Sequence, residues 1–374
     1  MMLAKKPPMG WNSWNTFGED ISEALIMKPA DVMVETGLRD AGYEYVVIDD
    51  CWSERRRVDG KIVTDKNKFP HGMRYLADYI HSKGLKFGMY SCAGNWTCAG
   101  YPGSLGYEYV DAQMFADFGV DFLKYDFCHK PDDVNGPQLY YRMSMALKAT
   151  GRDILFSACN WGSDNVEQWI RSTGSHIYRS TGDIIDNFNS YRDIFLSQID
   201  KISYSGIGCY NDLDMLIVGM NGRGNVGHGG CSVEEYRTHF ALWCLFMSPL
   251  MIGCDVRNMD YETKKTLMMQ DLIAINQDEE ARPPFLVGGY TGDRLVFFRH
   301  LSNNEYCLAF VNFSQYKEKI HTLFCDCGLA DNSGYAFDMF DIYQQKNIGK
   351  YTEGFSVEVP AHGCRIYKVK VVKA

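Results

Sequence analysis

Short runs of β-branched and aromatic residues alternate with helix-like segments over the first three quarters of the chain. This alternation is typical of a parallel sheet whose strands are joined by helical crossovers. Eight runs over roughly 250 residues predict a (β/α)8 barrel, an α/β fold. A doubly wound sheet is the competing architecture, but no GxGxxG follows the first run. The runs are Met9–Trp14, Tyr43–Asp49, Lys86–Ser91, Asp121–Asp126, Ile154–Cys159, His176–Thr181, a weaker one at Gly206–Tyr210, and Pro249–Gly253.

The pattern changes after Ile275–Pro284, where strand-like runs follow one another with few helical segments between them. Asn, Ser, Gly and Asp separate these runs, which indicates an antiparallel β-sandwich. We therefore predict a catalytic barrel at residues 1–277 and an antiparallel β domain at 278–374. The second domain holds no cluster of reactive residues, so its expected role is to cover and stabilise the barrel. Its runs include Asp293–His300, Tyr306–Phe313, Tyr335–Tyr343, Gly354–Pro360 and Cys364–Val372.

Composition and charge narrow the range of partners. The 374 residues carry a formal net charge of -9 without a dense Lys/Arg run, which argues against nucleic acid or an anionic membrane. The N-terminus lacks an apolar signal core, and no stretch of about 18 apolar residues occurs. We expect a cytoplasmic protein, or a secreted one whose signal has been removed. The 13 cysteines show no paired CxxC spacing, so no structural zinc site is predicted.

Carboxylates gather where the predicted barrel strands end, which is where barrel enzymes build their active sites. Such a cluster suits either a divalent metal or a pair of carboxylates acting on a glycosidic bond. Metal sites in barrel hydrolases usually include histidines, and few of the nine histidines here follow a strand. We therefore expect no metal and no other cofactor. The carboxylates are Asp49, Asp50, Asp126, Asp183, Asp212 and Asp214.

Lys124 and Asp126 lie two residues apart at the end of one predicted strand, so their side chains share a face. A neighbouring cation keeps an aspartate ionised and available as a nucleophile. The alternative is a simple ion pair at a strand end. The other strand-end carboxylates favour the catalytic interpretation.

Aromatic residues accompany the carboxylates at the strand ends. An indole or phenol face can stack on the apolar face of a pyranose, although a tryptophan taken alone is more often part of the core. Their grouping with carboxylates favours a sugar ligand. They are Trp11, Trp14, Trp52, Tyr90, Trp96 and Trp161, whereas Trp243 lies in a helix-like segment and is assigned to the core.

Several long motifs resemble glycoside hydrolase family 27, whose best-known members are α-galactosidases. The resemblance runs in order from Pro7 to about Asp278. The motifs are PPMGWNSWN, YEYVVIDDCW, KFGMYSCAGNWTCAGYPGSLGYE, FGVDFLKYDFC, CNWG, RSTGD, NDLDML and AINQD.

The resemblance implies a retaining hydrolase in which Asp126 is the nucleophile and Asp183 the acid/base. The two carboxyl groups of such an enzyme lie about 5 Å apart. We expect a raised pKa for Asp183 and a low pKa for Asp126, because the positive charge of Lys124 lies beside Asp126.

The resemblance also implies the residues that bind the sugar. Asp49 and Asp50 would accept hydrogen bonds from the 4- and 6-hydroxyls of galactose, Lys124 would donate on the 3- and 4-hydroxyl side, and Arg179 would hold the 2-hydroxyl. The remaining residues expected around the sugar are Trp14, Tyr90, Cys159, Asn160, Trp161, Asp214 and Met215. Cys98 and Cys128 match positions that form a disulfide in secreted relatives, and at most one disulfide is predicted.

Specificity in this family depends on the loop after the fifth strand, where Asn160 of CNWG resembles yeast-type α-galactosidases. We expect an α-galactosidase, with α-N-acetylgalactosaminidase and β-L-arabinopyranosidase as enzymatic alternatives. A galactose-binding protein without catalysis is a further alternative, which the presence of both Asp126 and Asp183 disfavours. The expected partner is an α-galactoside. The sequence leaves the oligomeric state open between a monomer and a homo-oligomer, although family members often associate.

Overall fold

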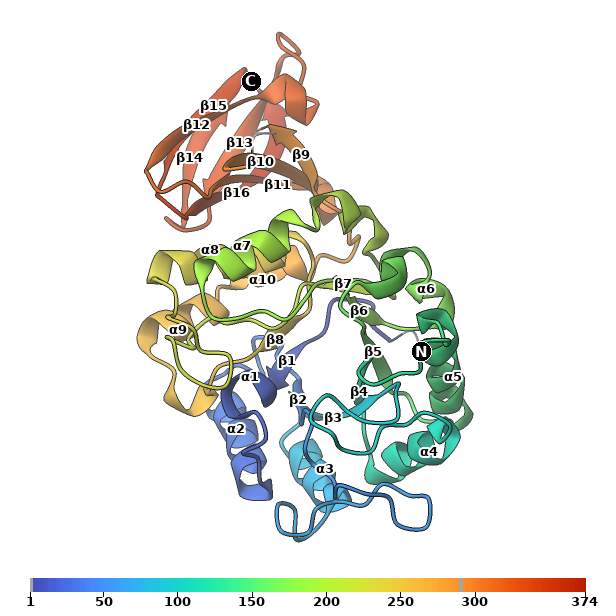
Figure 1. Cartoon of the computed structure of the whole chain (residues 1–374). Helices are drawn as coiled ribbons and strands as arrows, with labels where there is room; N and C mark the ends of the chain where they lie inside the picture. Colours follow the sequence, from blue (N-terminus) through green and yellow to red (C-terminus); the bar gives the residue numbers. More distant parts are fainter. Residues whose placement is uncertain (1–2, 289–291) are drawn as a thin grey trace.

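The computed structural model describes residues 3–288 and 292–374, and its first part is a barrel of parallel strands surrounded by helices (Figure 1). Within these residues, eight strands pair in the order β7-β6-β5-β4-β3-β2-β1-β8. Leu216, just after β7, joins the two end strands by a parallel bridge to Ile252. The predicted (β/α)8 fold is confirmed. The strands are β1 (Met9–Asn12), β2 (Tyr45–Val47), β3 (Lys86–Cys92), β4 (Phe122–Asp126), β5 (Leu155–Cys159), β6 (Ile177–Arg179), β7 (Tyr210–Asp212) and β8 (Leu250–Ile252).

The seventh strand lies later in the chain than its sequence pattern indicates. The predicted run Gly206–Tyr210 shares only Tyr210 with β7, because Gly206 and Cys209 form a tight turn closed by a backbone bridge. The strand itself is Tyr-Asn-Asp, and all three residues are buried. Two polar residues on a three-residue strand give no hydrophobic signal, which explains the displacement.

The helices around the barrel begin and end at recognisable capping residues. Ser232 and Glu235 form a reciprocal capping box at the start of α8, and Gly119 ends α4 in the left-handed conformation with φ 84°. The helices are α1 (Trp14–Phe17), α2 (Glu23–Glu35), α3 (Met73–Ser82), α4 (Glu108–Phe118), α5 (Gly136–Ala149), α6 (Ile170–Thr173), α7 (Phe188–Leu196), α8 (Val233–Leu245), α9 (Tyr261–Leu267) and α10 (Gln270–Asn276).

The C-terminal part is a sandwich of two antiparallel sheets. The larger sheet has the order β14-β13-β16-β11-β10-β9, and β12 pairs with β15. The sandwich is as predicted, but β9, β12 and β14 are not among the strand-like runs found in the sequence. Two of them are polar edge segments, EKIHTL and KNIGKY. The strands are β9 (Phe285–Gly288), β10 (Arg294–His300), β11 (Glu305–Asn312), β12 (Glu318–Leu323), β13 (Tyr335–Asp341), β14 (Lys346–Tyr351), β15 (Gly354–Val359) and β16 (Cys364–Lys373).

The larger C-terminal sheet is buried on both faces. Residues of one face, such as Phe298, pack inside the sandwich, while Phe297 on the other face packs against Phe195 of α7 and Phe246 beside α8. Arg299 is fully buried, and its guanidinium donates to the carbonyl oxygens of Cys244 and Leu245 at the end of α8. Apolar packing and this helix-end contact hold the sandwich against the barrel (Figure 1).

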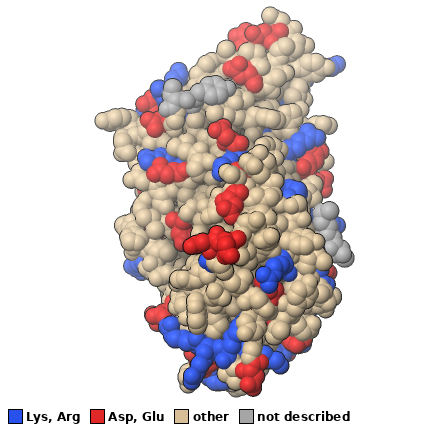
Figure 2. Space-filling model, turned by 45° about the vertical axis from the view of Figure 1, so that its right-hand side comes forward, with Lys and Arg blue, Asp and Glu red and all other residues tan. Residues whose placement is uncertain are grey.

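Positive and negative side chains are interspersed over most of the face drawn in Figure 2, with a group of basic residues at its lower end. Among residues 3–288 and 292–374, every helix is too short or too polar to span a lipid bilayer.

Candidate active site

A cavity of about 250 Å³ opens where the barrel strands end. Its volume is below the range of about 300–1,000 Å³ that is usual for drug-sized ligands, so it suits one sugar ring. The cavity brings together most of the residues singled out in the sequence. It is lined by Trp14, Asn15, Asp49, Asp50, Tyr90, Cys98, Lys124, Asp126, Trp161, Arg179, Asp183, Ile184, Ile185, Asp214, Met215, Asn225, Val226 and His228.

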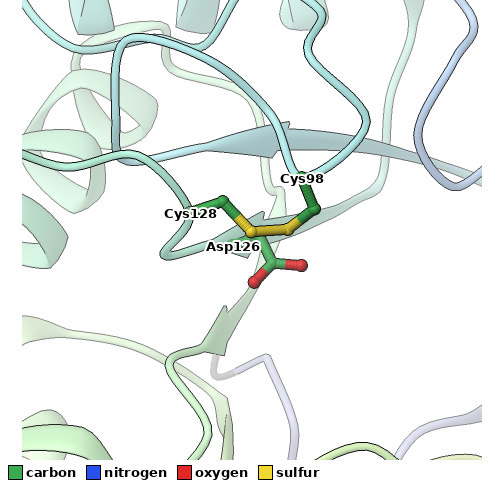
Figure 3. A group of neighbouring side chains, drawn as sticks. All are labelled: Cys98, Asp126 and Cys128. Carbon is green, nitrogen blue, oxygen red and sulfur yellow. A yellow bond between two sulfur atoms is a disulfide. The ribbon is translucent and has the colours of Figure 1, made fainter.

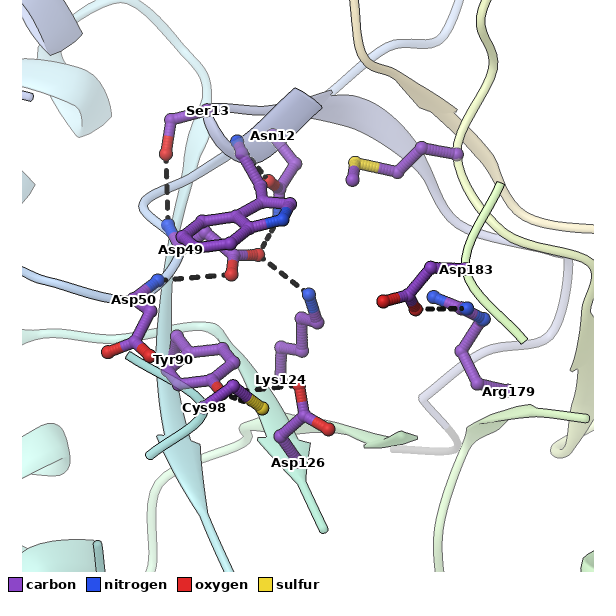
Figure 4. A network of polar contacts seen from close by, with 12 residues as sticks. Asn12, Ser13, Asp49, Asp50, Tyr90, Cys98, Lys124, Asp126, Arg179 and Asp183 are labelled. Atoms are coloured by element: carbon purple, nitrogen blue, oxygen red, sulfur yellow. Dashed lines mark hydrogen bonds and ion pairs between the residues drawn. The ribbon is translucent and has the colours of Figure 1, made fainter. Parts of the chain in front are cut away.

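Lys124 and Asp126 both line this cavity, as expected for two residues on one face of β4, but they do not pair with each other. The Lys124 ammonium donates to Asp49 Oδ2 at 2.8 Å, and the Asn12 amide donates to the same oxygen at 2.7 Å. Figure 4 shows the Lys124 side chain extending away from Asp126 and toward Asp49. Burial opposes the charge on Lys124, but the attraction of Asp49 outweighs it and raises the pKa of the ammonium.

Asp126 is buried at the end of β4, with 5% of its surface exposed. Its Oδ1 accepts a hydrogen bond from the Phe127 amide at 2.9 Å, and its Oδ2 accepts one from the Tyr90 hydroxyl at 3.2 Å. Burial raises the pKa of Asp126 to about 6, against the opposing attraction of Lys124.

Arg179 at the end of β6 organises the other side of the cavity. Its guanidinium pairs with Asp183 at 2.8 Å and with Asp214 at 2.9 Å. Asp214 also accepts from the Ile184 amide at 2.7 Å, so it anchors the segment that carries Asp183. The Asp183 side chain is 72% exposed, which leaves it open to solvent at the cavity entrance. Figure 4 shows Asp126 and Asp183 on different sides of one space.

The order of the two pKa values is the reverse of the sequence-based expectation. Partial loss of water around Asp183 tends to raise its pKa even though its side chain is 72% exposed, but the charge and hydrogen bond of Arg179 outweigh this effect and hold the pKa below its usual range. Asp126 has the raised pKa because it is more deeply buried, and the effect of this burial outweighs the attraction of Lys124. In the unliganded site, Asp126 is therefore the carboxyl group that keeps its proton to the higher pH.

Asp50 is held by the loop that follows β3. Its Oδ2 accepts from the Ala99 amide at 3.0 Å and its Oδ1 from the Cys51 amide at 2.7 Å. Burial raises its pKa despite these bonds. A disulfide between Cys98 and Cys128 joins this loop to the segment after β4. It is the single disulfide among the described cysteines, and Cys51 is a free thiol.

Two of the expected sugar-binding residues do not line the cavity. Asn160 is fully buried, and its amide nitrogen donates to the Ser163 carbonyl at 2.9 Å. Cys159 lies beneath the cavity floor, in a smaller space that also contains Asp212. Their positions follow from the short loop after β5, which turns at Trp161 with φ 55° and presents the indole in their place.

The aromatic residues divide between cavity and core. Trp14, Tyr90 and Trp161 line the cavity as predicted. Trp11 and Trp52 are core residues whose indole N–H groups donate to buried carbonyls, and Trp96 is 48% exposed. Position at a strand end therefore did not distinguish the aromatic residues that line the cavity from those that pack in the core or lie on the surface.

Sequence reasoning missed Asp186, which joins two walls of the cavity. It is fully buried and accepts from the Gly222 amide at 2.7 Å and the Tyr236 hydroxyl at 2.8 Å. Its own amide donates to the Val226 carbonyl at 3.0 Å. These bonds tie the segment after Asp183 to the loop at Asn221–Cys231. Asp186 follows no strand, so the sequence offered no signal for it.

Replacing Asp186 by alanine leaves the Gly222 amide and the Tyr236 hydroxyl without an acceptor. We expect the free energy of unfolding to fall by about 1–3 kcal/mol for each donor left unpaired. Urea unfolding measures this loss. Asp193→Ala on α7 is the control, because that carboxylate is 65% exposed and its loss should change stability by less than about 0.5 kcal/mol. Equal stability of the two variants would contradict the assignment.

Comparison with known proteins agrees with this architecture. The family model described as Alpha galactosidase A matches residues 6–278, and that of the Alpha galactosidase C-terminal beta sandwich domain matches residues 291–369. The chain is 42% identical to an α-galactosidase of Cyamopsis tetragonoloba, over 98% of this chain and 86% of the relative. It is 39% identical to α-galactosidase mel1 of Schizosaccharomyces pombe, over 99% of this chain and 90% of the relative.

Solved structures give the same result. α-Galactosidase I from Mortierella vinacea superimposes with a TM-score of 0.92 at 36% identity, covering 100% of this chain and 99% of that one. The MEL1 α-galactosidase of Saccharomyces cerevisiae, whose structure was also determined with raffinose, has a TM-score of 0.90 at 30% identity and covers 99% and 98%. On the sequence match and on these structures, this chain belongs to the alpha-galactosidase family.

Proposed function

We propose that this chain is a retaining α-galactosidase that releases terminal α-D-galactosyl residues from oligosaccharides or glycoconjugates. The observation that carries the proposal is the placement of Asp126 and Asp183 on one cavity of single-sugar size. Relatives named α-galactosidases at about 40% identity over nearly the whole chain support the same substrate class.

In the proposed reaction, ionised Asp126 attacks the anomeric carbon while Asp183 donates a proton to the departing oxygen. A covalent galactosyl-aspartate forms, and Asp183 then deprotonates the water that releases galactose. Tyr90 and the Phe127 amide orient the two oxygens of Asp126 through the bonds described above. The mechanism requires the two carboxyl groups to lie about 5 Å apart.

The sugar hydroxyls meet polar groups that are already fixed in place. Asp49 is held by Lys124 and Asn12, and Asp50 by two backbone amides. We propose that these carboxylates accept hydrogen bonds from the 4- and 6-hydroxyls of galactose. Because the carboxylates are buried and held in place, they cannot move to meet the displaced 4-hydroxyl of an epimer, and the hydrogen bond to that hydroxyl would be lost.

Asp183 must gain a proton before it can act, and substrate binding supplies two physical reasons for a rise in its pKa. The bound sugar removes water from a side chain that is 72% exposed in the free site. It also places the ionised Asp126 opposite Asp183 in a drier cavity, where repulsion favours protonation of one partner.

Hydrolysis of three p-nitrophenyl glycosides tests the function. We expect kcat/KM to be highest for the α-D-galactopyranoside, ahead of the α-N-acetylgalactosaminide and the β-L-arabinopyranoside. Preference for the acetamido sugar would replace the proposal with an α-N-acetylgalactosaminidase. Galactose binding without hydrolysis of any of the three would indicate a non-catalytic binding protein.

The pH dependence of kcat/KM follows from the two pKa directions. The reactive pair needs one proton in total, and it holds one only between the lowered pKa of Asp183 and the pKa of about 6 at Asp126. We therefore expect kcat/KM to be greatest in mildly acidic solution and to fall as the pH rises through about 6. A profile that is flat from pH 5 to 8 would contradict this pairing.

The two parts of the chain have different proposed roles. The residues that line the cavity all lie within residues 14–228. We propose that residues 1–277 carry the reaction, and that residues 278–374 form a separate domain that stabilises the barrel through α7, α8 and Arg299.

A further inference from the structure

Cys98, Asp126 and Cys128 form a group at the edge of the cavity that the proposed reaction uses only in part. One ligand atom from each residue lies within 4.8 Å of the others. Figure 3 shows the disulfide of Cys98 and Cys128 directly beside the Asp126 carboxylate. Among the described residues, this is the one group of three His, Cys, Asp or Glu side chains close enough to share an ion.

The disulfide is within reach of solvent and lies beside Asp126, the proposed nucleophile. Cys98 is exposed and lines the cavity, so a small reductant can approach its sulfur. The Tyr90 hydroxyl lies 3.2 Å from Asp126 Oδ2 and 3.4 Å from Cys98 Sγ. A change in the oxidation state of this sulfur therefore occurs next to the group that attacks the sugar.

We propose that reduction of the Cys98–Cys128 disulfide creates a site for a soft divalent metal ion such as zinc, held by both sulfurs and Asp126. A phosphine reductant transfers two electrons and takes an oxygen from water, and the S–S bond becomes two thiols. Metal binding then displaces the two thiol protons. The bound ion would occupy a carboxylate oxygen of Asp126 and block its attack, a consequence that rests on the proposed function.

The geometry of the group suits this ion. Zinc binds thiolates at about 2.3 Å and carboxylates at about 2.0–2.2 Å, so its ligand atoms are about 3.3–3.8 Å apart in a tetrahedral site. The atoms here lie within 4.8 Å, and the Cα atoms of the two cysteines are 5.2 Å apart. Rotation of the freed thiol side chains would bring them to these distances. Three protein ligands would leave a fourth position open, as in catalytic zinc sites.

The test compares oxidised and reduced full-length protein in a Cys325→Ser/Cys327→Ser background. Cys325 is exposed and Cys327 half-buried, and this pair lies in the C-terminal domain, so the background removes a competing site. After phosphine treatment and its anaerobic removal, zinc uptake is measured by equilibrium dialysis and metal analysis. Cobalt supplies a second readout, because thiolate–cobalt bonds give a near-ultraviolet charge-transfer band.

We expect the reduced protein to bind one zinc ion per chain more than the oxidised protein and to show the cobalt band. Its hydrolysis of p-nitrophenyl α-galactoside should be lost with zinc and recovered with a chelator. Cys98→Ser and Asp126→Asn should each weaken zinc binding at least about tenfold, because losing an outer-shell partner alone costs about 10–100-fold.

Equal zinc uptake by the oxidised and reduced proteins would overturn the proposal, as would unchanged binding in Cys98→Ser or a disulfide that resists the phosphine in the folded protein. The metal measurements do not depend on turnover. If the oxidised, zinc-free protein hydrolyses none of the three glycosides, the proposed function fails while the zinc site is still tested.

Discussion

Replacing Asp126 by asparagine is expected to lower kcat by roughly 10⁴–10⁶-fold, the range seen when a covalent nucleophile or its base is removed from a hydrolase. Asparagine has nearly the same shape and still accepts from the Phe127 amide, but its uncharged amide cannot form the galactosyl ester. Galactose binding, measured by calorimetry, should persist because Asp49, Asp50 and Lys124 are unchanged.

Asp212→Asn is the matched control for this substitution. Asp212 is also buried, and burial raises its pKa to about 6, but it lies beneath the cavity and accepts from the Asp214 amide. An amide oxygen can replace that acceptor, so the variant should keep most of its activity. Comparable losses in the two variants would mean that general disruption, and not loss of a nucleophile, explains the effect.

A smaller substitution makes the same prediction chemically specific. In Asp126→Gly, the space left by the carboxylate can admit azide, and attack on the bound α-galactoside should give β-galactosyl azide. The inverted product, identified by nuclear magnetic resonance, would place the missing nucleophile at residue 126. Formation of the α-azide, or no rescue together with unimpaired galactose binding, would point to a different nucleophile.

The second large effect is expected at Asp183, and its size should depend on the leaving group. Asp183→Asn removes the proton donor, and general acid catalysis contributes about 10²–10⁴-fold. Oligosaccharides such as raffinose should lose that factor. A 2,4-dinitrophenyl galactoside departs without a proton, so formation of the galactosyl-enzyme from it should change little, and the intermediate should accumulate as a burst of released phenol.

The pH profile of Asp183→Asn separates this role from a structural one. With Asp183 gone, kcat/KM for the dinitrophenyl substrate requires only ionised Asp126, so it should rise through a single pKa and then stay level. The fall above about pH 6 expected for the natural chain should disappear. A variant that keeps that fall would show that another group supplies the proton.

Arg179 provides a reason to expect that Asp183 is sensitive to its surroundings. The same guanidinium pairs with exposed Asp183 and with Asp214, which is 4% exposed. The buried pair is fixed by two backbone amides at Asp214, whereas the exposed pair is screened by water. A sugar hydroxyl that binds Arg179 would displace Asp183 from the guanidinium and leave the Arg179–Asp214 pair intact. Asp183 would then be free to take up a proton.

Local sequence determined most of the fold. Seven of the eight barrel strands were located from apolar runs rich in strand-forming residues. These runs can be recognised without knowing their partners, because the apolar character of a buried strand is visible in its own few residues. The strand-end motifs KYD and RSTGD likewise located Asp126 and Asp183, since the end of a parallel strand is itself a position at the mouth of a barrel. The polar strand β7 lacks that local signal, so the position predicted for it from the sequence was too early in the chain.

Only the tertiary structure decided how the charges are arranged. Lys124 pairs with Asp49, 75 residues away, and not with Asp126 two residues along its own strand. Burial and Arg179 then reversed the expected pKa order of Asp126 and Asp183. Ion pairs and desolvation depend on distances between segments that are far apart in the chain, and strand periodicity carries no information about those distances.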